Sequence, residues 1–158
     1  MNVAASELVI REALPADLPG VQRLYLELNN AAENAEVPQD RAEQFIVELK
    51  RFPGSALLVG VIGETVVTTC TLVVIPNLTR RATPYALIEN VATHSGHRKH
   101  GYATRLLHEA THRAFEAGCY KVMLLAGSKD PAVLGFYEKA GFEQSKTGFQ
   151  KRNKVAGF

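Results

Sequence analysis

Hydrophobic and polar positions along the chain follow two periods, which separate expected strands from expected helices. Apolar residues three or four positions apart indicate a helix, and short Val-, Ile- and Leu-rich runs between turn residues indicate a strand. Strands are expected at residues 7–14, in a hairpin at 55–76, and at 85–93, 120–126, 141–146 and 148–152. Helices are expected at residues 15–34, 38–52, 101–117 and 130–140. The order β-α-α-β-β-β-α-β-α-β-β predicts an α/β fold (an α+β mixed sheet) in one domain, 1–158.

The bulk composition excludes several classes of protein. The 158 residues are 46% hydrophobic and 22% charged with a net charge of +2, as in an ordinary globular protein. A charge this small predicts neither a nucleic-acid nor a membrane partner. The N-terminal residues show no signal-peptide pattern, and no apolar run approaches the roughly 20 residues of a membrane span. We therefore expect a cytoplasmic protein. Cys70 and Cys119 lack C-x-x-C spacing, which favours two buried, reduced side chains over a disulfide or a nucleophile.

Two catalytic motifs overlap between His97 and Phe115. The first, RKHGYA at residues 98–103, follows an expected strand and opens an expected helix. A helix start offers unpaired N–H groups and about half a positive charge, which suit a pyrophosphate. Gly101 and the small Ala103 let the backbone approach a ligand closely, and Arg98 and Lys99 add positive charge. The alternative is a solvated basic turn.

The second motif is H-E-x-x-H at His108, Glu109 and His112, a pattern of zinc peptidases. The apolar stripe of the same helix lies on the other side, so the two histidines are expected on its solvent face. A catalytic zinc also needs a third ligand and a cavity. His94, His97 and His100, spaced by three in a loop, have no carboxylate or cysteine cluster beside them. We therefore expect no metal site.

Three segments resemble the GCN5-related N-acetyltransferases (GNAT superfamily): LVIREALPADLPGVQRLY, IENVATHSGHRKHGYATRLL and GFYEKAGF. The resemblance implies the GNAT fold, acetyl-CoA as acetyl donor, a small-molecule or peptide amine as acceptor, no metal, and a homodimer. The segment ENVATHSGHRKHGYATRLL, with GCYKV and GFYEKAGF, most resembles the glucosamine-phosphate N-acetyltransferases. Backbone groups at the strand end are implied to hold the pantetheine and the following loop to hold the pyrophosphate. These coenzyme residues are Val91, Ala92, Thr93, Arg98, Lys99, His100, Gly101, Tyr102, Ala103 and Thr104.

The sequence departs from the family pattern in two places. Lys99 and His100 stand where the family usually has Arg-Gly or a similar pair. GSKDP follows the strand at 120–126, where many members place an Asn. The second departure bears on how the pantetheine arm is held.

An amine acceptor also requires acid–base groups. With a pKa of about 10.4, only about one lysine-like amine in 10³ is unprotonated at neutral pH, so a base or a water path is needed. Glu89 interrupts an otherwise apolar strand, and the resemblance implies that it is this base, directly or through water. Tyr137 in GFYEKAGF matches the family's general acid. The alternatives are an edge-facing or salt-bridged Glu89 and a core Tyr137.

The sequence thus predicts an N-acetyltransferase that transfers the acetyl group directly. The first alternative is a non-catalytic acyl-CoA sensor on the same fold, and the second is a zinc hydrolase through His108 and His112. The helices expected at 15–34 and 38–52, which line the acceptor side in the family, are acidic. This acidity suits a cationic amine and equally suits a solvated surface; it comes from Glu27, Glu33, Glu36, Asp40, Glu43 and Glu48.

Overall fold

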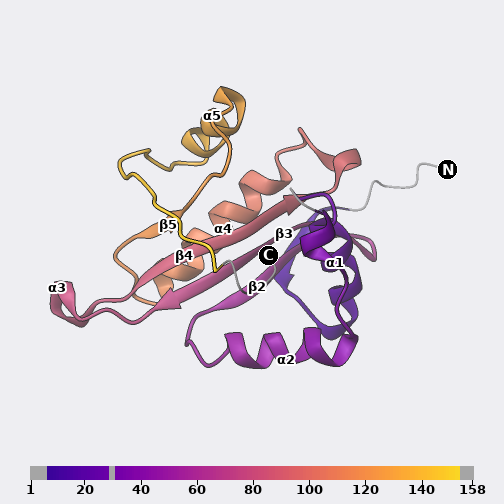
Figure 1. The fold of residues 1–158 in the computed structure, drawn as a ribbon, viewed down its shortest axis with the longest axis horizontal. Coiled ribbons are helices and arrows are strands. Elements are labelled where there is room, and N and C mark those ends of the chain that lie inside the picture. Colours follow the sequence, from indigo (N-terminus) through magenta and orange to yellow (C-terminus); the bar gives the residue numbers. More distant parts are fainter. Residues whose placement is uncertain (1–6, 29–30, 154–158) are drawn as a thin grey trace. The chain divides into compact units, whose positions relative to one another are not determined.

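The first of two compact units is built around a five-stranded mixed sheet. The computed structural model describes residues 7–28 and 31–153 and divides the chain into units 1–124 and 125–158. The sheet order is β1-β2-β3-β4-β5, with all neighbours antiparallel except the parallel pair β4 and β5 (Figure 1). The strands are β1 Val9–Glu12, β2 Ala56–Ile62, β3 Thr65–Ile75, β4 Tyr85–Thr93 and β5 Val122–Leu124. The expected mixed α/β class is confirmed.

Helices cover both faces of this sheet. Helices α1 (Leu18–Tyr25) and α2 (Gln39–Leu49) pack on one face, where their apolar residues share a core cluster with β2 and β3. Helix α4 (Tyr102–Glu116) packs on the other face against β2, β3 and β4. None of the described helices is long and apolar enough to cross a membrane. The remaining short elements of the first unit are η1 Pro15–Asp17, η2 Ala31–Asn34, α3 Thr79–Ala82 and η3 Ser95–His97.

The amphipathic pattern of α4 places it on the sheet as expected. Four apolar positions at helical spacing are fully buried, whereas the charged positions of the helix are exposed or half-buried. Burying four such side chains removes their apolar surface from water, the main force that holds a helix onto a sheet. The stripe consists of Leu106, Leu107, Ala110 and Ala114.

The structure differs from the expected helices in two places. The helix expected over 15–34 ends at Tyr25. Beyond it the backbone tightens into turns, because the N–H groups of Glu27 and Leu28 bond to carbonyls three residues back, at 3.0 and 3.1 Å. The turn α3, which the sequence analysis missed, has left-handed φ angles of 52° and 59° at Arg80 and Arg81.

The second unit holds α5 (Pro131–Lys139) and lacks the two closing strands that were expected at 141–146 and 148–152. No residue from 141 to 153 is in a strand. The one backbone bond among residues 143–153 is local, from Ser145 N–H to Glu143 O at 2.9 Å. A short polar strand is stable only against a neighbouring strand, and the described part of this unit offers none. This expectation was therefore wrong.

A β-bulge interrupts the pairing of β3 with β4. Thr71 lies opposite Glu89 and Thr69 lies opposite Ala92, so β4 carries one residue more than β3 over this stretch. Asn90 has a left-handed φ of 53°, a conformation that Asn tolerates better than most residues. Strand β5 pairs with β4 only at residues 86–88. From Glu89 onward, β4 therefore has no strand partner on this edge among the described residues of the unit.

A partly buried ion pair fixes the start of α1 against β1. Both guanidinium nitrogens of Arg11 donate to the Asp17 carboxylate, one of them at 3.0 Å. The Leu14 N–H donates to the same carboxylate at 2.7 Å. Asp17 is only 8% exposed. The Arg11 hydrogen bonds, helped by the Leu14 amide, hold the pKa of Asp17 below its usual range despite its burial.

We predict that Asp17→Asn lowers the free energy of unfolding at pH 7 by about 1.5–3 kcal/mol, the worth of hydrogen bonds to a charged group. A lowered native-state pKa stabilises the fold above the ordinary Asp pKa, and this stabilisation disappears as the pH falls below about 4. Urea denaturation of wild type and variant between pH 7 and pH 3 should therefore show converging stabilities. A difference that stayed constant across this range would contradict the role of the ionised carboxylate.

Candidate functional site

The open edge of β4 exposes backbone groups beside the bulge. The His94 N–H donates to Val67 O on β3 at 2.9 Å. Because backbone groups alternate along a strand, those of Thr93 point to the opposite edge. There the Thr93 carbonyl accepts a hydrogen bond from Arg98 Nε at 3.2 Å. The Ala92 carbonyl instead accepts from Thr68 Oγ1 at 3.1 Å. Of these two predicted pantetheine contacts, the backbone of Thr93 faces the open edge and the Ala92 carbonyl faces β3.

The N-terminus of α4 has no side-chain cap. Gly101 precedes the helix with a left-handed φ of 76° and forms no side-chain capping bond. The first helical bond runs from Arg105 N–H to Gly101 O at 3.0 Å, so the amides of Tyr102, Ala103 and Thr104 have no carbonyl of their own helix to bind. Its first turn carries no acidic residue. This helix start can therefore accept an anion through three N–H groups and the positive end of the helix dipole.

Open space lies in front of this helix start. A Cβ atom added at Gly101 would meet no heavy atom within 4 Å. The left-handed φ of Gly101 disfavours any other residue, because a side chain is strained in that conformation. Lys99, two residues earlier, also has a positive φ of 64°. The loop bends sharply on both sides of His100, and Gly101 leaves the approach to the helix start free.

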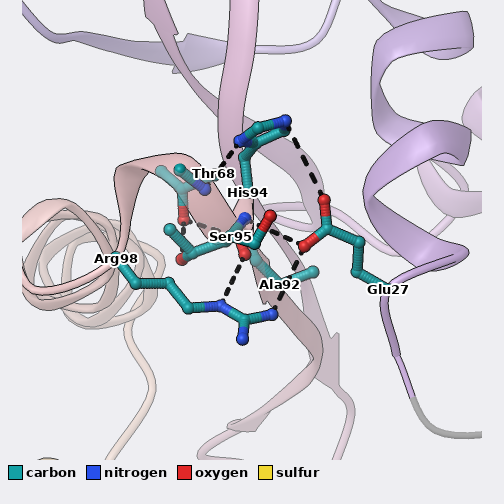
Figure 2. Close-up of polar contacts among 8 residues, drawn as sticks. Glu27, Thr68, Ala92, His94, Ser95 and Arg98 are labelled. Atoms are coloured by element: carbon teal, nitrogen blue, oxygen red, sulfur yellow. Dashed lines mark hydrogen bonds and ion pairs between the residues drawn. The ribbon is translucent and has the colours of Figure 1, made fainter.

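A carboxylate just beyond the end of α1 holds the beginning of the loop. Figure 2 shows Glu27 reaching toward the loop from beyond the end of α1. It accepts a hydrogen bond from the Ser95 N–H at 2.9 Å and another from Arg98 at 3.4 Å. His94 Nε2 lies 3.9 Å from the other carboxylate oxygen and forms an ion pair with it when protonated. The guanidinium of Arg98, predicted to face the pyrophosphate, is thus shared between Glu27 and the Thr93 carbonyl.

The loop histidines pack against one another and against Tyr102. The rings of His100 and Tyr102 stack at 5.4 Å, and those of His94 and His97 meet edge to face at 5.4 Å. His94 Nδ1 accepts a hydrogen bond from the Gly96 N–H at 3.0 Å. Packing and hydrogen bonding thus give each of these three histidines, which recur every third residue, a structural role that requires no metal.

The H-E-x-x-H residues lie on the outer face of α4, as expected. The Glu109 carboxylate pairs with Arg113 at 2.7 Å, and His112 lies 3.4 Å from Glu116. The glutamate that would serve a zinc peptidase as its base is therefore already engaged. In residues 7–28 and 31–153, no group of three or more His, Cys, Asp or Glu side chains is arranged to hold a metal ion.

Glu89 lies on β4 immediately before the bulge. Its side chain is exposed, and no described residue forms a hydrogen bond or an ion pair with it. The salt-bridged alternative is therefore not what the structure shows. A carboxylate without a cationic partner is available to accept a proton from a bound amine.

Tyr137 belongs to α5 in the second unit. Its ring meets Phe136 edge to face at 4.9 Å and Phe142 at 6.5 Å, so the side chain is half-buried in an aromatic cluster. Its role as a general acid remains a prediction.

The loop could be identified from the sequence, but the carboxylate that holds it could not. Glu27 lies 68 residues before Ser95 and appeared there only as one acidic residue of a helical surface. The signal that could have distinguished it is its place just beyond the last apolar turn of α1, where a side chain can reach past the helix end. The two cysteines agree with expectation: both are free and buried, and burial raises the pKa of Cys70 to about 12.

Comparisons with known proteins agree with this geometry. The model of the family described as "Acetyltransferase (GNAT) family" matches residues 18–142. A putative acetyltransferase of Agrobacterium tumefaciens, known from its structure, is 45% identical with a TM-score of 0.82, covering 92% of this chain and 99% of that one. A structure from Bacillus halodurans, described as a transcriptional regulator, is 28% identical with a TM-score of 0.82, covering 93% of this chain and 100% of that one.

A third structure bears on the glucosamine-phosphate resemblance. The glucosamine-6-phosphate N-acetyltransferase of Arabidopsis thaliana has a TM-score of 0.80 but only 18% identity, over 92% of this chain and 98% of that one. At this identity the likeness extends to the fold alone, and the resemblance to that branch stays a prediction. Among curated proteins, no sequence matches this chain.

We predict that Glu27→Ala loosens the loop that begins at Ser95. The variant removes the acceptor of the Ser95 N–H and the partner of Arg98, at a cost of about 1 kcal/mol of stability. Amide hydrogen exchange at Ser95 should become faster, whereas Glu27→Gln, which keeps a side-chain oxygen, should retain most of the protection. Glu64→Ala, at the exposed β2–β3 turn, serves as control. Equal protection in Glu27→Ala and wild type would show that Glu27 does not hold the loop.

Proposed function

Because the chain belongs to the acetyltransferase (GNAT) family, we propose that it transfers the acetyl group of acetyl-CoA directly to a primary amine, with residues 1–158 as one N-acetyltransferase domain. The observation that carries the proposal is the uncapped start of α4, where Gly101 leaves three N–H groups accessible beside the open edge of β4. A diphosphate with a long amide-containing arm matches such a site: an anion-binding helix end followed by a strand edge that can form hydrogen bonds.

The coenzyme is held mainly by backbone groups. The N–H groups of Tyr102, Ala103 and Thr104 bind the pyrophosphate, as at other helix N-termini. Lys99 and His100 supply the nearby positive or hydrogen-bonding side chains, and Arg98 reaches the phosphates from its position beside Glu27. The amides of the pantetheine arm bind along the stretch of β4 at Val91, Ala92 and Thr93, through the backbone groups there that face the open edge rather than through the Ala92 carbonyl, which faces β3. The exposed edge of β4 supports this assignment, most directly at Thr93.

Glu89 accepts the proton of the acceptor amine, directly or through water. The amine lone pair then attacks the thioester carbonyl carbon, a new C–N bond forms, and the C–S bond to coenzyme A breaks. Glu89 is suited to the first step because it is exposed and no described cation neutralises it. Glu89 also precedes, along β4, the stretch to which we assign the pantetheine arm.

Tyr137 protonates the departing thiolate. A phenol keeps its proton at neutral pH and can donate it to a developing thiolate. The support for this role is the match of GFYEKAGF to the family's acid-bearing segment.

The acceptor is a small-molecule or peptide amine. Several acidic residues that the sequence offered for a cationic amine have partners of their own. Glu27 contacts Arg98, Glu43 accepts from Gln39, and Glu48 pairs with Arg41. A homodimer and a cytoplasmic location, both expected from the sequence, belong to the same proposal. Gel filtration at several concentrations tests the dimer.

A second candidate is an acyl-CoA sensor on the same fold. The description of the 28%-identical Bacillus halodurans structure as a transcriptional regulator gives this candidate its support. Binding of coenzyme A without turnover on any amine of a broad panel, assayed by release of free thiol, would favour the sensor.

We predict that Gly101→Glu abolishes the stabilisation of the fold by acetyl-CoA. In wild type, ligand at 100 times its dissociation constant should add about 2.7 kcal/mol. The variant places bulk and negative charge against the phosphates, so thermal unfolding should become insensitive to the ligand. His108→Glu puts the same charge on the solvent face of α4 and should keep the full shift. A folded Gly101→Glu protein with an undiminished shift would refute the loop assignment.

We predict that Glu89→Gln and Tyr137→Phe slow turnover with different pH dependences. Loss of the base should lower kcat at neutral pH by about 10²–10⁴-fold, with partial recovery at high pH, where solvent deprotonates the amine. Loss of the phenol should matter most at high pH, where other proton donors are scarce. Both variants should retain the acetyl-CoA thermal shift. Unchanged pH–rate profiles in both would eliminate the acid–base assignments while leaving coenzyme binding intact.

A further inference from the structure

A buried threonine on the neighbouring strand is the cross-strand partner of Glu89. Thr71 on β3 is the register partner of Glu89 on β4, immediately before the bulge. Residues that face each other in an antiparallel pair share one face of the sheet, with Cβ atoms about 4.5–5.5 Å apart. This is the face covered by α1 and α2. A side chain at Thr71 is therefore placed to reach the carboxylate of Glu89 when that carboxylate turns toward the sheet.

Unlike those of its neighbours, the hydroxyl of Thr71 has no well-formed hydrogen bond within the described residues. Thr71 is only 5% exposed, and its buried Oγ1 atom forms no hydrogen bond of regular geometry among the described residues. The polar group that it approaches is the phenol of Tyr25, whose pKa it helps to lower. Thr69 Oγ1, two residues away, donates to Leu58 O at 2.8 Å, and Thr68 Oγ1 donates to Ala92 O at 3.1 Å. A buried polar group left unpaired is costly, and native proteins keep few of them. An unpaired hydroxyl beside a reactive carboxylate points to a partner that is present only during the reaction.

The side chain of Tyr25, on α1, packs beside Thr71 and Thr69 on this face of the sheet. It ends α1 and packs against the core cluster on the same face. Burial raises the pKa of Tyr25, and hydrogen bonding with the hydroxyls of Thr71 and Thr69 partly opposes that rise. The contact with Thr71 falls short of regular hydrogen-bond geometry, so the Thr71 hydroxyl can exchange it for a better acceptor. The phenol therefore stays protonated and adds no charge beside Glu89. It also limits the access of water to Thr71, so a hydrogen bond made there would be worth more than one in solvent.

We propose that Thr71 is a positioning residue for Glu89: its hydroxyl donates a hydrogen bond to the Glu89 carboxylate while that carboxylate accepts the proton of the acceptor amine. The inference rests on the proposed function of Glu89. The proton moves from the ammonium nitrogen to one carboxylate oxygen, and Thr71 keeps its own proton while bound to the other oxygen. Nothing is oxidised or reduced. The exposed, unpaired Glu89 side chain is free to turn toward Thr71 when an acceptor arrives.

Such a bond has two measurable effects. It fixes the orientation of the carboxylate, which raises kcat, and it favours the ionised carboxylate, which moves the acidic limb of the pH–rate profile to lower pH. A threonine kept only for its strand propensity would do neither. Removing the hydroxyl would then leave catalysis unchanged, because a β-branched side chain of the same shape fills the position.

Thr71→Val is the discriminating variant because it keeps the shape and removes only the hydroxyl. We expect kcat to fall about 10-fold, as for one hydrogen bond to a charged group, and the acidic limb to move to higher pH. The KM for acetyl-CoA and the acetyl-CoA thermal shift should not change. The melting temperature should stay constant or rise, because an unpaired buried hydroxyl has been removed. Thr71→Ser, which restores a hydroxyl, should recover most of the lost kcat.

The matched control is Thr69→Val, the same substitution two positions away on β3. It removes a hydroxyl that is paired with Leu58 O, so the melting temperature should fall while the acidic limb stays in place. A double-mutant cycle completes the design: in a Glu89→Gln background, Thr71→Val should cause little further loss, because the group that it positions is gone.

The outcomes separate this inference from the proposed function. An active wild type, with kcat and acidic limb unchanged in Thr71→Val, overturns the role of Thr71 and leaves the acetyltransferase proposal standing. A loss of activity that accompanies a lower melting temperature and is not recovered in Thr71→Ser also overturns it, because the effect is then structural. No turnover by wild type on any amine, despite coenzyme binding, overturns both proposals.

Discussion

The bulge in β4 is the constraint on which the candidate site depends. Adding one residue to β4 between Glu89 and Ala92, with Asn90 in a left-handed conformation, bends the strand just after its pairing with β5 ends. A regular strand would continue that pairing and bury its own N–H and C=O groups in the ladder. The interruption leaves a strand edge inside a well-packed unit without a partner, and a strand edge of this kind can bind an extended ligand through its backbone alone.

The bulge and the start of α4 form one feature because a short loop joins them. Only residues 94–101 separate the end of β4 from the first helical residue, so the strand edge and the unpaired amides are held near each other by chain connectivity. Glu27 adds a long-range contact to this local arrangement by accepting from Ser95 and Arg98. The loop is therefore held by a residue near the N-terminal end of the chain as well as by the strand and helix that flank it.

The sequence was most informative where a repeating pattern reflects burial. The helical stripe of α4 and the Val-rich hairpin were predicted because hydrophobic burial dictates both. The resemblance led to the loop before α4, and Gly101 adopts the conformation that a glycine there suggests. The two closing strands were expected from short segments whose pairing partner the sequence could not specify. The bulge at Asn90 and the contact of Glu27 with the loop were not predicted, because neither gives a repeating pattern of hydrophobic residues. The bulge depends on a single backbone dihedral angle, and the Glu27 contact joins residues that are distant in the sequence.

The burial of both cysteines has a practical consequence for measuring this chemistry. Thiol reagents react with thiolates, and a thiol buried in apolar surroundings is both shielded and slow to ionise. Burial raises the pKa of Cys70 to about 12 and also raises that of Cys119, and the chain has no other cysteine. A chromogenic disulfide reagent added to the folded protein should therefore react with the free thiol of the released coenzyme A and only slowly with the cysteines of the protein. Continuous detection of the sulfur product can be run at high protein concentration, where a slow reaction on a poor amine would otherwise be lost in background.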